Sequence, residues 1–266
     1  MPTARLNGID IHFERHGAGP RVLVFNGSGA TIAGAGPMIE RLATVCEVLI
    51  HDQRCLGRTT VTDEVPTTAD YAADGAALLD HVGWSTAAVF GISFGGMVAQ
   101  EFAVTHPGRV ERLALLCTSP GGEGGSSYPL HTVAALPPDE QDRLRLQLAD
   151  SRYDEAFLAA HPFDRMLVDL GAAARAVEKA DRQRRGEDLQ LQARAGHDVW
   201  DRLAAIDCPT LVMCGEFDAL APPRNSEAIA GRIAGSELRR YQGGHAFLWQ
   251  DRSAWPDVLG FLAPPA

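Results

Sequence analysis

The feature that most constrains the fold of this chain is a regular alternation of short apolar runs with helical segments. The apolar runs predict strands at residues 21–25, 47–51, 86–90, 110–117, 210–214 and 237–241, and the segments between them predict helices at residues 37–44, 67–82, 94–105 and 224–234. Each return to a parallel strand needs a crossover, so repeated strand–helix units predict a parallel sheet with helices on both faces. The fold class is therefore α/β, with a mostly parallel sheet.

The chain begins with a different pattern. Asn7-Gly8 separates two short strand-like runs at residues 4–6 and 9–13. Both positions of such a two-residue turn require positive φ, which asparagine and glycine tolerate. The sequence therefore predicts a β-hairpin, and an antiparallel start to the sheet.

The alternation breaks once, after the glycine-rich stretch at residues 120–127, and residues from about 137 to 203 are almost wholly helical in pattern. The strand pattern resumes at residue 210. We therefore expect a core formed by residues 1–120 and 204–266, with a helical cap inserted at residues 121–203.

Charge and composition exclude several classes of partner. The formal charge of −10 disfavours nucleic-acid phosphates and anionic lipids, and the one basic run, at residues 182–185, fits a solvated helix face. We expect a small-molecule substrate, no nucleic acid and no membrane. The sequence does not determine the oligomeric state.

The cysteines and the N-terminal residues indicate a compartment. The five cysteines are odd in number and show no C-x-x-C spacing, so we expect reduced thiols and no metal site. The first residues lack the basic and apolar segments of a secretory signal, and no apolar run reaches the ~20 residues of a membrane span. We expect a cytoplasmic protein.

Gly91-Ile92-Ser93-Phe94-Gly95 is a G-x-S-x-G motif between a predicted strand and a predicted helix. In that setting the motif is typical of a nucleophile elbow, in which a sharp turn lifts the serine clear of the sheet. Small residues are needed on either side because strand and helix approach closely. Ser93 is the predicted nucleophile.

The partners of Ser93 are expected beyond other strand ends, because the carboxyl ends of parallel strands share one edge. Asp218 follows the strand at 210–214, and His245 follows the strand at 237–241, which gives the chain order Ser, Asp, His. His245 is the predicted general base and Asp218 the acid that orients it. Glu216 is the nearest rival of Asp218; His51 also ends a strand but comes too early in the chain.

An acyl-transfer site also needs backbone N–H groups directed at the developing oxyanion. The loop Asn26-Gly27-Ser28-Gly29 follows the strand at 21–25. The predicted oxyanion donors are the N–H groups of Ser28 and of Phe94, the residue after the nucleophile.

With these motifs in place, the chain resembles the α/β-hydrolase superfamily, within it the group that includes 3-oxoadipate enol-lactonases, cofactor-free haloperoxidases and esterases. The resemblance rests on residues 26–29 and 52–59, the serine motif, Asp218 and His245. It implies the same catalytic triad, and we expect no cofactor. Two positions depart from the family pattern: Asn26 stands where histidine is common, and Cys55 where glycine is common.

These observations predict hydrolysis of a small to medium apolar carboxylic ester or lactone through an acyl-enzyme on Ser93. The apolar residues 247–249 after His245 fit either a substrate surface or the core of the last helix. Two alternatives stay open at this point: a carbon–carbon bond hydrolase using the same triad, and a ligand-binding protein of this fold with little turnover.

Overall fold

The computed structural model describes residues 2–264, except for the side chains of residues 134 and 138. At its centre lies an eight-stranded sheet with the order β1-β2-β4-β3-β5-β6-β7-β8. Strand β2 pairs antiparallel with β1 and β4, and every other pairing is parallel. The strands are β1 (Thr3–Leu6), β2 (Ile9–His16), β3 (Arg21–Phe25), β4 (Glu47–His51), β5 (Ala87–Ile92), β6 (Val110–Leu116), β7 (Thr210–Gly215) and β8 (Glu237–Tyr241). The predicted α/β class with a mostly parallel sheet is confirmed.

The turn between β1 and β2 follows the predicted chemistry. Asn7 and Gly8 both have positive φ, at 48° and 77°. Two positive φ values match the right-handed twist of the flanking strands, which is why this turn type joins two-residue hairpins. The hairpin is therefore confirmed.

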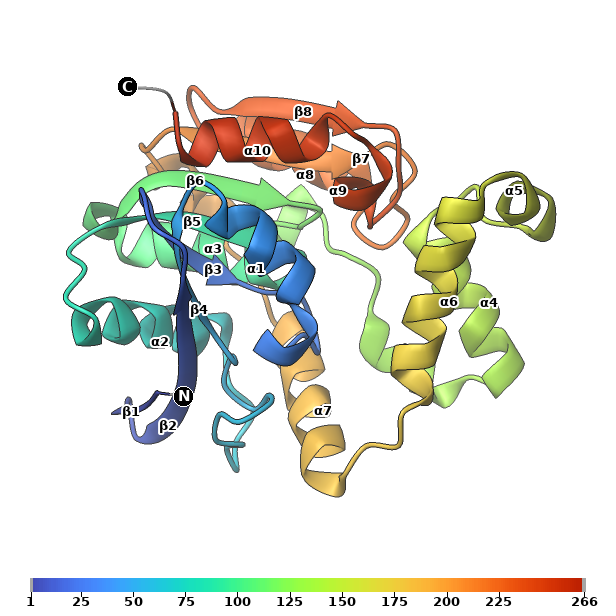
Figure 1. The fold of residues 1–266 in the computed structure, drawn as a ribbon, viewed down its shortest axis with the longest axis horizontal. Coiled ribbons are helices and arrows are strands. Elements are labelled where there is room, and N and C mark those ends of the chain that lie inside the picture. Colours follow the sequence, from blue (N-terminus) through green and yellow to red (C-terminus); the bar gives the residue numbers. More distant parts are fainter. Residues whose placement is uncertain (1, 265–266) are drawn as a thin grey trace.

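Helices cover both faces of the sheet (Figure 1). One face carries α1 (Gly36–Ala43), α9 (Phe247–Gln250) and α10 (Ala254–Leu262), and the other carries α2 (Thr68–His81), α3 (Phe94–Thr105) and α8 (Pro223–Arg232). Strand β3 contributes side chains to both faces of the sheet. Leu23 and Phe25 pack toward α2 and α3, and Val22 and Val24 pack toward α1 and α10. Successive side chains of a strand point to opposite faces, so a strand buried on both faces is apolar throughout.

The start of α2 is fixed by local hydrogen bonds. The Thr67 hydroxyl accepts a hydrogen bond from the backbone N–H of Asp70, and the Asp70 carboxylate accepts one from the backbone N–H of Thr67. This reciprocal pair is a capping box, which fixes the first turn of α2.

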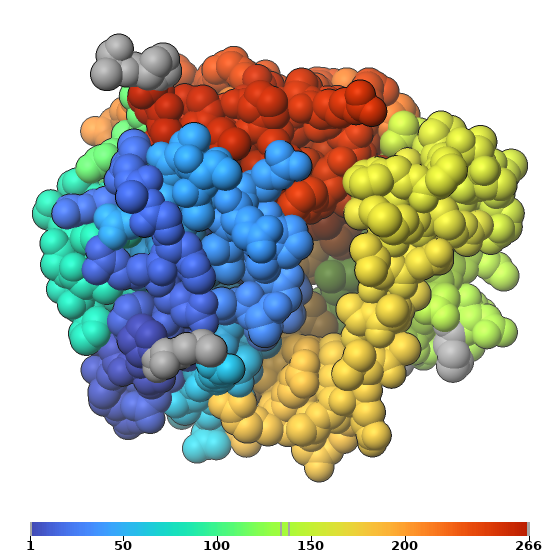
Figure 2. Space-filling view, viewed as in Figure 1, coloured from blue at the N-terminus to red at the C-terminus, as the bar shows by residue number. Residues whose placement is uncertain are grey.

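Four helices lie between β6 and β7, and we call them the cap: α4 (Pro138–Ala149), α5 (Glu155–Ala160), α6 (Pro162–Ala176) and α7 (Asp181–Ala195). Short 3₁₀ turns lie at Ile32–Gly34, Pro107–Arg109, Gly122–Gly124, Leu130–Ala135 and Trp200–Ala205. Figure 1 places α4, α5 and α6 to one side of the sheet, and Figure 2 shows a hollow between α6 (yellow) and the core. All four cap helices fall within residues 121–203; those limits of the cap stay a prediction.

Helix α7 packs directly on the core. A Cβ atom added to Gly186 would lie 1.9 Å from the backbone oxygen of Cys55, so only glycine permits this approach. Arg182 donates hydrogen bonds to the backbone oxygens of Gly57 and Thr59, at 2.9 Å and 2.5 Å. The cap is therefore anchored to the core along α7.

All five cysteines are free thiols in the structure. Within residues 2–264, no helix combines the length and the apolar character that crossing a membrane requires.

Candidate active site

Ser93 occupies a strained turn between β5 and α3. Its φ of 56° and ψ of −119° are unusual for a residue with a side chain. A Cβ atom at Gly95 would lie 1.9 Å from the backbone oxygen of Phe25, and one at Gly91 would lie 2.5 Å from the backbone oxygen of Gly95. The two motif glycines therefore allow strand and helix to meet closely enough to hold Ser93 in this conformation. Gly96 likewise gives packing room, since a Cβ atom there would contact Thr118.

The three predicted side chains meet at the carboxyl edge of the sheet. The Ser93 Oγ lies 2.9 Å from Nε2 of His245, and Nδ1 of His245 lies 2.7 Å from Oδ2 of Asp218. They follow β5, β8 and β7 respectively. An ionised carboxylate only accepts hydrogen bonds, so Nδ1 of His245 donates to Asp218 and Nε2 is left to accept from the Ser93 hydroxyl.

Asp218 is held rigidly. Its carboxylate is buried, and its second oxygen, Oδ1, accepts hydrogen bonds from the N–H groups of Leu220 and Ala221 at 2.9 Å and 2.8 Å. Glu216, the rival in the sequence, is exposed. The geometry therefore favours Asp218 as the partner of His245.

His51 ends β4 but lies in the core beneath the site. It is 2% exposed, and neither ring nitrogen has a hydrogen-bond partner among the described residues. Burial lowers the pKa of His51 to about 4. His51 is therefore a neutral core residue.

The loop after β3 lies beside Ser93, as the oxyanion prediction requires. A Cβ atom at Gly27 would lie 3.6 Å from Cβ of Ser93. In the part of the chain that the structure describes, the N–H groups of Ser28 and Phe94 make no hydrogen bond. Both donors are thus available at this edge, and their role in binding an oxyanion stays a prediction.

The two departures from the family pattern are accommodated locally. The Asn26 side chain accepts from the N–H of Gly27 at 2.8 Å, and the Asn26 backbone oxygen accepts from Gln53 at 2.8 Å. Cys55 adopts a φ of 73°, a conformation that a glycine would take without strain. The loops keep their place beside Ser93 with these residues.

Helix α7 also fixes the oxyanion loop. The fully buried Gln190 accepts a hydrogen bond from the N–H of Gly29 at 2.7 Å through its side-chain oxygen. The sequence analysis did not identify Gln190, because nothing local in a helical pattern shows a contact with a loop 161 positions away.

The segment after α4 is clamped between the two loops that carry Asp218 and His245. The N–H of His245 donates to the backbone oxygen of Ala149 at 2.6 Å, and the N–H of Ser151 donates to that of Phe217 at 2.9 Å. Between them, the buried Asp150 accepts from Gln250 at 3.0 Å. We call this contact region the cap joint; it too was missed in the sequence.

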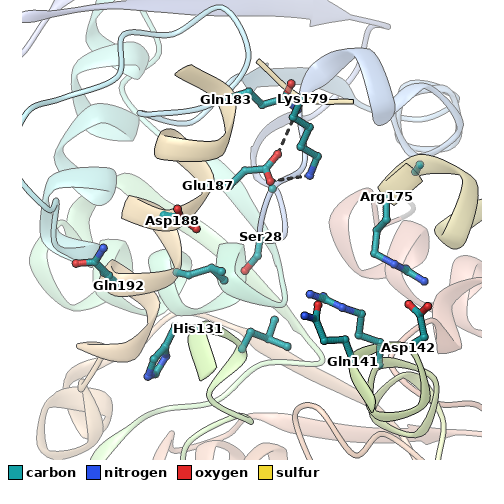
Figure 3. A pocket seen from close by; sticks show the side chains of 15 residues that line it. Ser28, His131, Gln141, Asp142, Arg175, Lys179, Gln183, Glu187, Asp188 and Gln192 are labelled. Carbon is teal, nitrogen blue, oxygen red and sulfur yellow. Dashed lines mark hydrogen bonds and ion pairs between the residues drawn. The ribbon is translucent and has the colours of Figure 1, made fainter. Parts of the chain in front are cut away.

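A cleft of about 1010 Å³ opens between the core and the cap. Figure 3 shows Ser28 facing the same cavity as His131, Arg175 and Lys179, with Lys179 paired to Glu187. Most of its lining is polar or charged: Ser28, His131, Gln141, Asp142, Arg145, Arg175, Lys179, Gln183, Glu187, Asp188 and Gln192. This lining disagrees with a purely apolar substrate.

The apolar residues after His245 belong to the core. Phe247 and Leu248 are buried, and Phe247 stacks on Tyr241 with the ring centroids 5.1 Å apart. Trp249 packs edge-on against Trp255. Of the two interpretations left open by the sequence, the core interpretation holds, and these side chains give no evidence for an apolar substrate surface.

One set of potential metal ligands occurs among the described residues. Cys117, Asp218 and His245 each offer a ligand atom, and these atoms lie within 4.8 Å of one another. Burial, together with the negative charge of Asp218, raises the pKa of the Cys117 thiol well above its ordinary value, so the thiol stays protonated. Because a thiol binds a metal as its thiolate, and His245 and Asp218 are already hydrogen-bonded to each other, this set fits the Ser93 site rather than an ion.

Known proteins share this architecture. The chain is 29% identical to a poly(3-hydroxyalkanoate) depolymerase of Ectopseudomonas oleovorans, over 91% of the chain and 83% of the relative. It is 28% identical to a putative carbamate hydrolase RutD of Azorhizobium caulinodans, over 97% and 95%. The solved enol-lactonase of Burkholderia xenovorans superposes with a TM-score of 0.79 at 21% identity, covering 98% of this chain and 99% of that one, a likeness of fold. Residues 20–251 match the family model described as the alpha/beta hydrolase fold, and the chain belongs to that family.

Proposed function

We propose that the protein is a serine hydrolase that cleaves a carboxylic ester or lactone through an acyl-enzyme on Ser93. The observation that carries the proposal is the unbroken hydrogen-bonded chain from the Ser93 Oγ through His245 to Asp218, at 2.9 Å and 2.7 Å. Such a chain is the arrangement in which an imidazole can deprotonate a serine hydroxyl.

The reaction follows from this geometry. Nε2 of His245 takes the hydroxyl proton as Oγ of Ser93 attacks the carbonyl carbon, and the N–H groups of Ser28 and Phe94 stabilise the oxyanion. The alcohol leaves with the proton from His245, and the acyl group stays on Ser93. Water then repeats the sequence and releases the acid. Asp218 keeps its charge throughout and stabilises the imidazolium.

The names of the relatives support hydrolysis of an acyl compound but differ in substrate. One is a depolymerase of a polymer and another a putative carbamate hydrolase. We therefore propose the ester or lactone class from the site, and place the choice of substrate in the cleft beneath the cap.

The direct test compares wild type with Ser93→Ala on p-nitrophenyl acetate and butyrate. We expect kcat to fall by about 10⁴- to 10⁶-fold, because the nucleophile is lost. Ser85→Ala, which changes an exposed serine, is the matched control and should keep full activity.

Three further results would decide against the proposal. Equal turnover by wild type and Ser93→Ala would exclude Ser93 as the nucleophile. Slow labelling of wild type by a fluorophosphonate, with negligible ester turnover and tight ligand binding, would favour a binding protein instead. Turnover of a diketone without turnover of simple esters would favour carbon–carbon bond hydrolysis.

A further inference from the structure

Arg194, in the last turn of α7, is a buried cation. It is 6% exposed. Its two terminal nitrogens donate to the backbone oxygen of Tyr128 at 2.7 Å and to the Ser127 hydroxyl at 2.6 Å, and both acceptors are neutral. Its Nε is buried and has no partner among the described residues. The guanidinium therefore retains unused donor capacity in a buried place.

Arg194 differs in its charge balance from Arg54, the other buried arginine among the described residues, and from the half-buried Arg152. Arg54 pairs with Asp74, and Arg152 pairs with Asp150. Arg194 has no ion pair with a described carboxylate. Burial lowers the pKa of Arg194 to about 10, and Asp218 is the acid that opposes this shift. A buried charge is costly unless it is compensated, so this position is suited to an anion that the chain itself does not supply.

Arg194 lines a small cavity beside the active site. The cavity measures about 90 Å³ and is also lined by Met97, Ser119 and His197. Met97 lies one turn after Ser93 in α3, and its N–H donates to the Ser93 backbone oxygen at 3.3 Å. Nε2 of His197 is a second buried donor or acceptor without a described partner. The cavity therefore has mixed polar and apolar walls, contains the buried polar groups of Arg194 and His197, and lies against α3 one turn after Ser93.

The small cavity adjoins the cleft. His131 lines both the 90 Å³ cavity and the 1010 Å³ cleft, and the cleft is also lined by Ser28 of the oxyanion loop. The two cavities therefore share a wall at His131, on the side of the cleft that Ser28 also lines. The volume of the small cavity, about three times that of a water molecule, suits a carboxylate with a short stem.

We propose that Arg194 forms an anion subsite, and that the substrate is an ester or lactone whose acyl part carries a carboxylate. This inference rests on the serine-hydrolase function proposed above. The planar guanidinium binds the carboxylate with charge-assisted hydrogen bonds and loses its uncompensated charge, while the ester carbonyl lies at Ser93. The polar cleft then admits the charged substrate.

The test uses two esters of the same chain length, monoethyl glutarate and ethyl pentanoate, in which a carboxylate replaces a methyl group. Wild type should prefer monoethyl glutarate in kcat/KM. Arg194→Gln should lower the ratio of the two kcat/KM values by about 10- to 100-fold, the range expected for hydrogen bonds to a charged group. Arg194→Lys should give a ratio between those of wild type and Arg194→Gln, since lysine keeps the positive charge but cannot donate two parallel hydrogen bonds to a carboxylate. Arg143→Gln, which removes an exposed charge from α4, is the control and should leave the ratio unchanged.

A binding measurement separates this proposal from the catalytic one. Glutarate should bind Ser93→Ala, measured by calorimetry, and should bind the double variant Ser93→Ala, Arg194→Gln at least tenfold more weakly. Glutarate binding that depends on Arg194 would support the subsite. If Ser93→Ala also kept full turnover, the same result would exclude Ser93 as the nucleophile.

Two results would overturn the subsite. One is a wild type that prefers ethyl pentanoate and does not bind glutarate. Another is an equal loss for both esters in Arg194→Gln together with a lower melting temperature, which would show that Arg194 only ties down residues 127 and 128. If Arg194→Gln does not fold, the wild-type ester ratio and glutarate binding decide the question, and the absence of both refutes the proposal.

Discussion

Helix α3 begins directly after Ser93 and helix α6 borders the cleft, and the two helices are built in opposite ways. Every residue of α3 from Phe94 to Ala103 is buried, whereas α6 buries none and leaves Phe163, Met166 and Leu170 between 45% and 60% exposed. The first is fixed by the sheet on which it packs. The second is held by a few polar contacts, such as that of Asp164 with Tyr153 at 2.8 Å.

The difference assigns separate tasks to the two regions. Rigid packing keeps Ser93 within hydrogen-bonding distance of His245, and catalytic geometry tolerates little displacement. A helix with few buried contacts belongs to the part of a fold that opens most readily. We therefore expect the core to determine the reaction and the cap to determine which substrate reaches it.

The largest expected effect tests whether chemistry resides in the core alone. Asp218→Asn should lower kcat by about 10⁴-fold, because the amide stabilises the wrong tautomer of His245. The free energy of unfolding should change by only about 1 kcal/mol, since the amide oxygen can still accept from Leu220 and Ala221. Esterase kinetics and urea unfolding measure both quantities.

Glu216→Gln is the matched control for Asp218→Asn, because it neutralises an exposed acid on the same loop. It should leave kcat within about twofold. A large loss of activity in Glu216→Gln, with little in Asp218→Asn, would reverse the assignment of the acid.

A second prediction concerns the cap joint, where the two regions meet. Asp150 is buried and paired with Arg152 at 2.6 Å, so Asp150→Ala leaves a partly buried guanidinium without its partner and should cost about 3 kcal/mol of unfolding free energy. We expect kcat to fall by about tenfold as well, because the loops of Asp218 and His245 both bond to this segment.

The control for Asp150→Ala is Asp181→Ala, which breaks the exposed ion pair with Arg184. Such pairs contribute at most about 1 kcal/mol. Equal unfolding curves for the two variants would mean that the joint carries no stability of its own.

The smallest expected effect is the loss of unfolding free energy at acid pH that the buried His51 causes. His51 is neutral in the folded protein because burial lowers its pKa from 6.5 to about 4. The unfolded chain therefore binds a proton more readily, so this contribution to stability is complete above pH 6.5 and is lost as the pH falls toward 4. The loss amounts to about 3 kcal/mol or less, and His51→Phe should flatten the pH dependence of unfolding over that range.

His197 offers the comparison, since burial also lowers its pKa to about 4 and it lies where α7 returns to the core. If His197→Phe flattened the profile and His51→Phe did not, acid sensitivity would originate where the cap rejoins the core rather than beneath the sheet.

The core could be predicted from the sequence because its signals are local. The strands at 47–51 and 237–241 and the helix at 94–105 have the bounds that the apolar pattern gives, and β5 extends only two residues beyond the predicted end. The side chains at 93, 218 and 245 meet because parallel strands share a carboxyl edge, a rule that needs no knowledge of the cap.

The cap contacts could not be predicted in this way. Gln190, Arg194 and Gln250 act through partners that are 66 to 161 positions away, and their segments show ordinary helical patterns. The apolar run after His245 favoured neither of its two interpretations, because core and substrate surfaces use the same side chains. Tertiary contacts of the cap, rather than local pattern, determine which side chains line the cleft.

The hydrogen bond from Gly29 to Gln190 has a practical consequence for exchanging caps between relatives. Helix α7 lies between β6 and β7 with the other cap helices, yet it carries the acceptor that holds the loop beside the nucleophile, and Gly186 seats it on the backbone of Cys55. A chimaera that transplants the whole insertion would replace this support together with the substrate-facing helices. One that exchanges only α4 to α6 would retain this support of the oxyanion loop. It would still replace Asp150 and the cap joint, so we expect turnover to change together with selectivity.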